Sequence, residues 1–292
     1  MLLDAFEVTI VGIDSIDPAQ LQALSIGVGW PHRGEDWEFL RSVGEGIAAV
    51  DKIGRVVGSA MWFPYDERFA TIGMVITTPR LQAQGAGRWL MENVLQRVDC
   101  RALGLNATAE ALRLYVSLGF TIKQAVYQRQ GIAASPPDAA LPAGATLRAF
   151  GTGDLADIIA LDKRAFDSDR STLMKRLAEV STGQVLEREG RIQAFSLCRA
   201  FGRGHVVGPI VARCDEDAIA VTSPYVVEHA GHFLRVDTRQ RSGLFPQFLE
   251  LSGMSVYDTL NTMWMGRPWP IAREDAAPEA PITYGLASHT LS

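Results

Sequence analysis

The stretch that decides the fold is QAQGAGR, residues 82–88, between the apolar run IGMVITTP (72–79) and the segment WLMENVLQRV (89–98). The first run is rich in β-branched residues, which predicts a strand. The second places its apolar side chains on one helical face, which predicts an amphipathic helix. Gly85 and Gly87 therefore fall in a turn that joins a strand directly to a helix, where bare backbone is needed.

A glycine turn that opens a helix is a candidate phosphate site. The first N–H groups of a helix lack partners within the helix, and together with the macrodipole they attract anions. Two well-known nucleotide patterns do not fit, because the dinucleotide fingerprint has a third glycine and follows the first strand, and the P-loop ends in Gly-Lys-Ser/Thr. A tight turn that binds nothing stays open as the alternative.

A second motif follows in LGLNATAEALRLYVSLGF, residues 103–120. It predicts a short strand, then a helix capped near Thr108, with Leu112 and Tyr115 on one face. Gly119 is expected to end that helix, and Phe120 to begin another strand.

With both motifs in place, the chain resembles the GNAT superfamily of acetyl-CoA-dependent N-acetyltransferases. Their phosphate turn reads Gln/Arg-x-x-Gly-x-Gly/Ala, and the later segment reads Leu-Tyr-x-x-x-Gly-Phe. The matching residues are Gln82, Gly85 and Gly87 in the first motif and Leu114, Tyr115, Gly119 and Phe120 in the second. The resemblance covers about residues 1–130.

The resemblance implies a cofactor, acetyl-CoA, and a role for each matching segment. Backbone groups of Met74, Val75 and Ile76 would pair with the pantetheine amides, and Asn106 would contact the same arm. Tyr115 would be the general acid that protonates the departing thiolate; a buried core tyrosine is the alternative. The pyrophosphate would lie against the residues of the turn, which are Gln82, Ala83, Gln84, Gly85, Ala86, Gly87 and Arg88.

The chain divides at GIAASPPDAALPAGA, residues 131–145, which holds three prolines and two glycines. We expect a first domain at 1–130, a linker at 131–144, a second domain at 145–270 and a tail at 271–292. Both halves predict the same order of elements: strand, two helices, three strands, helix, strand, helix, strand. The predicted fold class is α/β, with two tandem GNAT-like domains, each a mixed, mostly antiparallel sheet flanked by helices.

The second half lacks the glycine turn. Its equivalent strand, HVVGPIV (205–211), is followed by the acids Asp215, Glu216 and Asp217, which suit a helix N-terminus but repel a pyrophosphate. This half resembles the degenerate second domain of bacterial tandem GNAT proteins. Because it lacks the glycine turn and carries these acids, we expect the chain to bind one cofactor, in the first half. We expect the second half to shape the acceptor site; a purely stabilising duplicate is the alternative.

The acceptor region is predicted at GWPHRGEDWEFL, residues 29–40, which borders the acceptor in GNAT proteins. His32 and Arg33 are its candidate binding residues, with Trp62 and Tyr65 from the end of the third strand. Asp66 and Glu67 are alternative bases. The competing interpretation of residues 29–40 is a helix start, with Asp36 in the first turn and Trp37 packed inward.

Composition narrows the class of protein. The 292-residue chain is 47% hydrophobic and 21% charged with a net charge of −5, which argues against a nucleic-acid partner. Three cysteines without a CxxC pair, and histidines without ligand spacing, predict neither a disulfide framework nor a metal site. No signal peptide or membrane span is evident, so we expect a cytoplasmic monomer or homodimer.

Together with the resemblance, these observations predict an acetyl-CoA-dependent N-acetyltransferase. It would transfer the acetyl group to a primary amine of a small molecule, by direct attack of the amine on the thioester. Two alternatives stay open. One is a catalytically silent acyl-CoA-binding sensor, and the other is a protein N-acetyltransferase acting on an N-terminus or a lysine.

Overall fold

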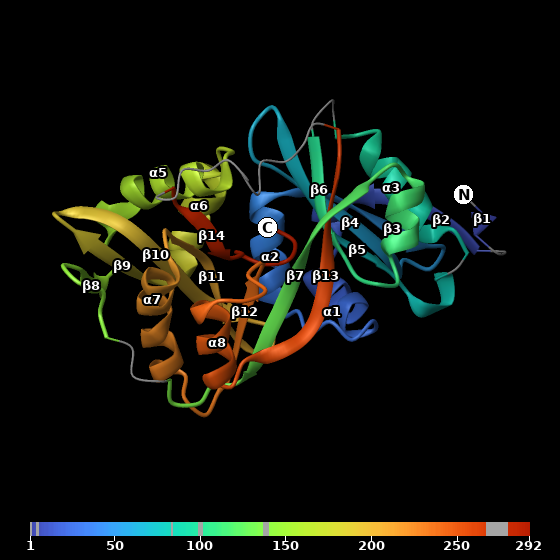
Figure 1. Cartoon of the computed structure of the whole chain (residues 1–292). Helices are drawn as coiled ribbons and strands as arrows, with labels where there is room; N and C mark the ends of the chain where they lie inside the picture. Colours follow the sequence, from blue (N-terminus) through green and yellow to red (C-terminus); the bar gives the residue numbers. More distant parts are fainter. Residues whose placement is uncertain (1, 4–5, 83, 99–101, 137–139, 267–279) are drawn as a thin grey trace.

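The computed structural model describes residues 2–3, 6–82, 84–98, 102–136, 140–266 and 280–292. Ala83, one of the predicted turn residues, lies outside them, as do residues 267–270 at the end of the predicted second domain and 271–279 of the predicted tail. Within the described residues, the strands and helices form two halves that follow one another along the chain (Figure 1).

The first half runs from the N-terminus to the strand that precedes the predicted linker. Its elements are β1 (Leu2–Leu3), β2 (Phe6–Gly12), α1 (Pro18–Ile26), α2 (Gly34–Val43), β3 (Glu45–Asp51), β4 (Val56–Pro64), β5 (Phe69–Thr77), α3 (Ala86–Leu95), β6 (Ala102–Ala107), α4 (Leu112–Ser117) and β7 (Thr121–Ile132).

The second half repeats the order of the first from β2 onward and adds one strand, β14, at its end. Its elements are β8 (Thr146–Ala149), α5 (Leu155–Phe166), α6 (Ser171–Val180), β9 (Thr182–Arg188), β10 (Arg191–Phe201), β11 (Gly204–Ala212), α7 (Asp215–Glu228), β12 (Phe233–Thr238), α8 (Leu244–Leu251), β13 (Ser255–Met265) and β14 (Ile282–Gly285). The predicted mixed α/β fold and the duplicated order of elements are confirmed. None of the described helices is long and apolar enough to cross a membrane.

Local sequence explains several element boundaries. Asp17 caps α1, since its Oδ1 accepts a hydrogen bond from the Ala19 amide at 2.9 Å, and Pro18 follows at the first helical position. The prediction that α4 is capped near Thr108 is wrong. The Ala111 amide donates to the Thr108 carbonyl at 3.2 Å, so this segment forms a separate turn, and α4 begins at Leu112.

The two halves share one sheet because they exchange their last strands. The strand order is β1-β2-β3-β4-β5-β6-β13-β7-β12-β11-β10-β9-β8, and β14 pairs with β11. Thus β13, from the second half, is antiparallel to β6 of the first half, and β7 is antiparallel to β12 of the second. Figure 1 shows β7 and β13 crossing the middle of the molecule, where they join the halves.

A hydrophobic core also connects the halves. Trp37 of α2 and Phe63 of β4 belong to the same buried cluster as Met174 of α6 and Phe195 of β10, and all four are fully buried. The inward packing of Trp37 agrees with a helix start in this region. The continuous sheet and the shared core together hold the two halves in a fixed arrangement.

Each half contains one pair of parallel strands that separate after a short contact. β5 and β6 pair only from Phe69–Ala102 to Thr71–Gly104. β11 and β12 pair only at His205–Leu234 and Val206–Arg235. We call these two openings the first and the second splay.

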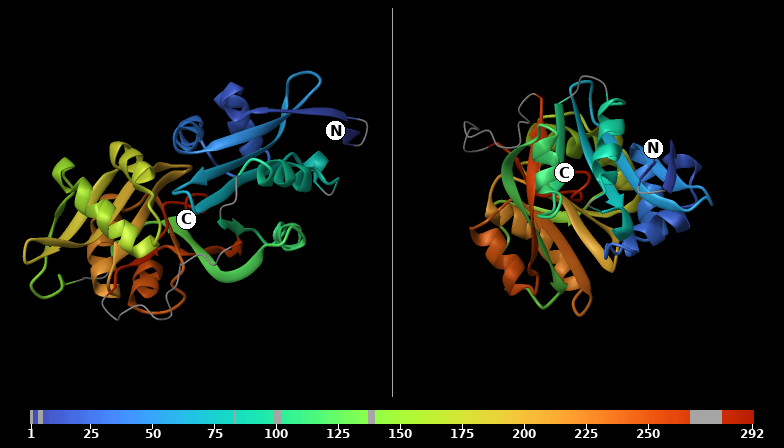
Figure 2. Two further views of the ribbon diagram at one scale, coloured as in Figure 1. Left: turned by 90° about the horizontal axis from the view of Figure 1, so that it is seen from above. Right: turned by 90° about the vertical axis from the view of Figure 1, so that its right-hand side faces the viewer.

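The second splay is filled by the chain itself. β14 pairs with β11 from Ile210 to Ala212, and the Leu286 amide then donates to the Asp237 carbonyl of β12 at 2.8 Å. From there residues 287–292 run toward the first half, and Figures 1 and 2 show the chain end lying between the two halves. We call residues 286–292 the terminal segment.

Candidate active site

The glycine turn lies between β5 and α3, as predicted. Gly85 is the N-cap of α3 with φ of 83°, a left-handed conformation that glycine adopts without strain. Apart from its chain neighbours, no described residue has an atom within 4 Å of where a Cβ on Gly85 would be. The first hydrogen bond of the helix runs from the Trp89 amide to the Gly85 carbonyl at 3.0 Å, so the amides of Ala86, Gly87 and Arg88 belong to the open first turn.

Side chains around the turn are tied back to the protein and leave the helix end open. The Gln82 side chain donates to the Thr77 carbonyl at 3.3 Å. Arg88 donates to Ser117 Oγ at 2.6 Å, which links α3 to α4. The turn is thus a backbone concavity at a helix N-terminus, the geometry of an anion site.

The strand before the turn is distorted at its middle. Met74 has φ of 51°, and the register between β4 and β5 shifts next to it. Ser59 Oγ donates to the Met74 carbonyl at 2.8 Å and holds the bulge. Because β6 has already diverged, the edge of β5 at Met74, Val75 and Ile76 has no β6 partner and can accept an extended ligand.

Tyr115 reaches the same opening from α4. Its side chain is nearly buried, and its ring packs against Phe120 at 5.9 Å between centroids. Burial raises the pKa of the Tyr115 hydroxyl well above its usual value, so the hydroxyl is protonated at neutral pH.

Asn106 is predicted to contact the pantetheine arm, and its side chain is occupied by protein groups. Its Nδ2 donates to the His289 carbonyl at 2.7 Å and to Ser292 Oγ at 3.0 Å. Its Oδ1 accepts from Thr262 Oγ1 at 2.6 Å. Asn106 therefore anchors the terminal segment in the first splay.

Further contacts fix the terminal segment at the point where β5 and β6 separate. Thr71 Oγ1 donates to the Thr290 carbonyl at 3.0 Å, and the Tyr65 hydroxyl donates to the Leu291 carbonyl at 2.7 Å. A Cβ on Gly73 would come within 2.4 Å of Thr290 Cγ2. Gly73 thus allows the segment to approach β5 closely.

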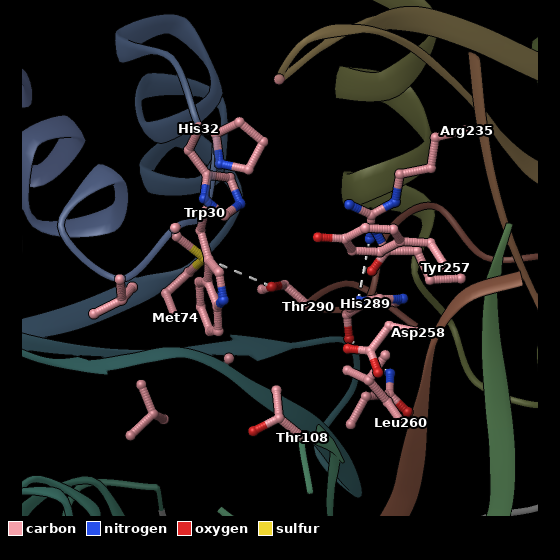
Figure 3. Close-up of a pocket in the computed structure, with 18 of the residues that line it drawn as sticks. Trp30, His32, Met74, Thr108, Arg235, Tyr257, Asp258, Leu260, His289 and Thr290 are labelled. Carbon is pink, nitrogen blue, oxygen red and sulfur yellow. Dashed lines mark hydrogen bonds between the residues drawn. The ribbon is translucent and has the colours of Figure 1, made fainter. Parts of the chain in front are cut away.

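These elements surround one cavity of about 490 Å³ between the halves. On its first-half side lie Gly73, Met74, Asn106 and Tyr115, together with His32. Figure 3 shows Trp30, His32 and Met74 facing Arg235, Tyr257 and His289 across the space, with Thr290 between them. The cavity therefore begins at the first splay and extends to the second half.

The four predicted acceptor residues have different positions. His32 lines the cavity, and burial lowers its pKa to about 4, against the opposing effect of Asp36, so the ring is neutral at pH 7. Arg33 is paired with Asp36 at 2.7 Å at the start of α2. Trp62 and Tyr65 pack in the interior, and neither they nor Arg33 belong to the residues that line the cavity.

The alternative bases lie in a turn away from the cavity. Asp66 accepts hydrogen bonds from the Arg68 and Phe69 amides at 2.7 and 3.0 Å and from Ser168 Oγ at 2.9 Å. Glu67 is exposed beside it. Both are structural turn residues of the β4–β5 connection.

The cavity also contains residues that sequence reasoning missed. They come from the second half, line the cavity, and have side chains that carry charge or hydrogen-bonding groups. They are Arg203, Arg235, Tyr257, Asp258, His289 and Thr290. No local motif marks them. Tyr257 and Asp258 reach the site on β13, which joins the first sheet, and His289 and Thr290 reach it on the terminal segment. Arg203 and Arg235 reach it from the β10–β11 turn and from β12, which pairs with β7 of the first half.

In the second half, the position equivalent to the glycine turn is blocked from within. Asp215 begins α7, and its Oδ2 accepts from the Phe245 amide at 3.0 Å while Oδ1 accepts from the Tyr284 hydroxyl at 2.9 Å. A carboxylate thus occupies this helix end, and β14 occupies the adjoining splay. In the described parts of the chain, no cluster of three or more His, Cys, Asp or Glu residues is arranged to hold a metal ion.

Models of known protein families match both halves of the chain. One acetyltransferase (GNAT) domain model matches residues 42–137, and another matches residues 158–276. The chain is a tandem GNAT acetyltransferase. One match begins at the end of α2 and the other inside α5, so each covers the larger part of one repeat and contains its splay.

Relatives of this tandem GNAT protein support the same architecture. An uncharacterized N-acetyltransferase of Bacillus subtilis, YitH, is 27% identical over 72% of this chain and 74% of its own length. A putative acetyltransferase of Pyrococcus horikoshii shares the fold with a TM-score of 0.76 at 17% identity, covering 100% of this chain and 98% of its own. A tandem GNAT protein from the clavulanic acid biosynthesis pathway has a TM-score of 0.65 at 15% identity, covering 90% and 100%.

Proposed function

We propose that this tandem GNAT protein transfers the acetyl group of acetyl-CoA to a primary amine on a small molecule. The observation that carries the proposal is the continuity of one cavity. The unpaired edge of β5 and the Tyr115 side chain lie at its first-half end, and the second half closes its other side.

The chain's own groups are suited to hold acetyl-CoA, which supplies the acetyl group as an activated thioester. The amides of Ala86, Gly87 and Arg88 would bind the pyrophosphate, and the edge of β5 at Met74–Ile76 would pair with the pantetheine amides. The free space at the Gly85 Cβ position fits this role, because a phosphate can approach the backbone there. The filled second splay and the Asp215 carboxylate support one cofactor per chain.

Tyr115 would act as the general acid. The nucleophile is a neutral amine, and the sulfur that leaves needs a proton as the carbon–sulfur bond breaks. Tyr115, in the helix that follows β6, is one of the residues that line the cavity. Its raised pKa keeps this proton available throughout the neutral and mildly alkaline range.

Two carboxylates can accept the proton that the amine loses. Asp258 of β13 and Glu110 of the β6–α4 turn both line the cavity, and Glu110 has a lowered pKa because its own backbone amide and Thr108 donate to it. His32 also lines the cavity, and because its pKa of about 4 leaves the ring neutral at pH 7, it is a third candidate. We favour Asp258, directly or through water.

A small molecule fits the cavity better than a protein substrate. An acceptor lysine or N-terminus would call for an open, acidic groove, whereas this cavity lies between the halves and contains arginines. A silent acyl-CoA sensor is the second candidate, and it would need the splay and the turn but no acceptor.

A screen for amine-dependent CoA release tests the proposal. Acetyl-CoA is incubated with the protein and with a library of primary amines, free thiol is followed continuously, and products are weighed by mass spectrometry. We expect at least one amine to release CoA with an equal amount of acetylated product. If the protein binds acetyl-CoA and no amine or peptide accelerates its cleavage, the sensor is the correct function.

A further inference from the structure

The second-half wall of the cavity carries an excess of hydrogen-bond donors. Arg203 follows Phe201 in the β10–β11 turn and Arg235 approaches the Phe201 ring from β12, and both line the cavity. We call these two residues the arginine wall, and Arg199 lies behind it. The guanidinium carbons of Arg199 and Arg235 lie 5.0 and 5.5 Å from the Phe201 ring centroid. The His32 ring from the first half lies 5.5 Å from it.

Arg235 is held in one orientation with donors to spare. Its Nε and Nη2 donate to Asp237 at 2.9 and 2.8 Å, and Asp237 is fully buried. No hydrogen bond to a described residue involves Nη1. Arg235 lines the cavity, so this nitrogen can serve a ligand whose acceptor group enters from the cavity side.

Arg199 is buried behind the wall with its donors largely unused. Nη2 donates to the Ala287 carbonyl at 3.1 Å, whereas Nε and Nη1 are buried and have no partner among the described residues. Burial lowers the pKa of Arg199 to about 10, so it keeps its charge at pH 7. An uncompensated buried cation makes the cavity wall in front of it favourable for an anion.

Arg203 completes the wall at the β10–β11 turn. The Gly202 amide donates to Asp36 Oδ2 at 3.0 Å, which fixes this turn to the first half beside His32. Arg203 is exposed, lines the cavity and makes no ion pair with a described residue. The neighbouring acids are already engaged, Asp36 by Arg33 and Asp237 by Arg235.

The opposite end of the cavity is acidic. Asp258 and Glu110 line it, near the point where β6 ends and the turn at Thr108 begins. In the view of Figure 3, Arg235 and His32 lie at one end of the space and Asp258 and Thr108 at the other, with Thr290 between them. The cavity is therefore polarised along its length.

We propose that the acceptor is an amino acid–like molecule, whose carboxylate binds to the arginine wall while its amine is directed to the acidic end beside the first splay. Arginine is suited to this task because its planar donors match a carboxylate. The inference rests on the proposed acetyl transfer and specifies its substrate class. It also gives the second half a role, since every member of the wall comes from it.

Matched acceptor pairs test the inference by turnover. CoA release is measured at saturating acetyl-CoA with glycine, β-alanine, γ-aminobutyrate and the common α-amino acids, each beside its own carboxamide. We expect the best acceptor to exceed its carboxamide at least about tenfold in kcat/KM, as for loss of a hydrogen bond to a charged group. The amine of a carboxamide is less basic and more often neutral, so this preference would run against intrinsic reactivity.

The variant Arg203→Gln identifies the residue. In this variant the kcat/KM ratio between the acid and its carboxamide should fall about tenfold, because the KM for the acid rises. The affinity for acetyl-CoA should stay unchanged. Arg191→Gln is the matched control, because Arg191 is exposed in the β9–β10 hairpin and does not line the cavity; it should behave like the wild type. Equal rates for acids and carboxamides, or an Arg203→Gln variant with the full preference, would overturn the inference.

A binding measurement separates this inference from the proposed function. N-acetyl amino acids and their carboxamides are titrated calorimetrically into the CoA-loaded protein. Carboxylate-dependent binding that weakens in Arg203→Gln supports the anion subsite, even if no acceptor in the panel turns over and acetyl transfer itself fails. If no carboxylate probe binds more tightly than its carboxamide, the subsite is refuted whatever the turnover assay shows.

Discussion

At the scale of single residues, the account depends most on Tyr115. The sequence motif singles it out, the residue lines the cavity, and burial raises the pKa of its hydroxyl. A buried tyrosine that merely packs would have the same ring contacts. The hydroxyl alone distinguishes the two roles.

The variant Tyr115→Phe keeps the ring and removes the hydroxyl. We expect cofactor affinity to stay nearly unchanged and kcat to fall about a hundredfold, the usual range for loss of a general acid. The loss should shrink at low pH, where solvent supplies the proton. Steady-state kinetics across pH, with calorimetry for affinity, measure both effects; wild-type turnover by the variant would make Tyr115 a packing residue only.

His32 makes a separate prediction about stability. Its folded pKa of about 4 lies below the ordinary 6.5, so between these values the unfolded chain binds more protons than the folded one. Stability should therefore rise with pH through this window, and His32 should contribute about 3 kcal/mol to that rise. His32→Gln should flatten the dependence, as measured by urea unfolding at pH 4.5 and 7.

The exposed His232 provides the control for this measurement. His232→Gln should keep the pH dependence of the wild type. If both variants show the wild-type slope, His32 is not buried in its neutral form.

At the scale of helices, strands and turns, residues close together in the chain predict local features well. They do not predict which distant strands pair. The turn at Gly85, the cap at Asp17 and the two hairpins follow from residues close together in the chain, so they could be predicted. The start of α4 was misplaced because the segment from Thr108 to Ala111 forms its own turn. Helix boundaries of this kind depend on competition between neighbouring hydrogen bonds.

The glycine turn can be tested against a control of the same backbone shape. Gly85→Glu should abolish detectable acetyl-CoA binding, because a carboxylate would enter the proposed pyrophosphate site. Gly54, in the β3–β4 hairpin, has φ of 81° against 83° for Gly85. Among the parts of the chain that the structure describes, chain neighbours aside, neither Cβ position has an atom within 4 Å. Gly54→Glu therefore introduces the same backbone strain and the same negative charge at a position outside the proposed pyrophosphate site.

Calorimetry and circular dichroism compare the two glycine variants. Both should unfold at similar temperatures, while only the Gly54→Glu protein should bind acetyl-CoA. Equal affinities for the two would show that the turn is a structural feature without a ligand.

At the scale of the whole molecule, strand exchange explains what the sequence could not reveal. β7 and β13 each read as the last strand of their own half, and nothing in their residues indicates that each pairs with the sheet of the other half. Asp258 lines the cavity from the exchanged strand β13, and His289 lines it from the terminal segment. Their place in the site was therefore invisible to motif analysis.

The same arrangement gives the halves unequal roles. In the first splay the terminal segment contacts β5 at Thr71, and the edge of β5 beyond it at Met74–Ile76 has no β6 partner. In the second, β14 pairs with β11, and the Asp215 carboxylate at the start of α7 accepts a hydrogen bond from the Phe245 amide of α8. The account therefore assigns cofactor binding to the first half and acceptor recognition largely to the second. The boundaries of the two domains stay a prediction, since a shared sheet gives no simple division.

A crystal structure of the chain with CoA tests this central claim most directly, because it reports the number and the place of bound cofactors together. We expect one CoA per chain, with its pyrophosphate at the amides of Ala86, Gly87 and Arg88 and its pantetheine along Met74–Ile76. β14 should remain paired with β11. Density for CoA beside β11 and Asp215, or two molecules per chain, would contradict the account.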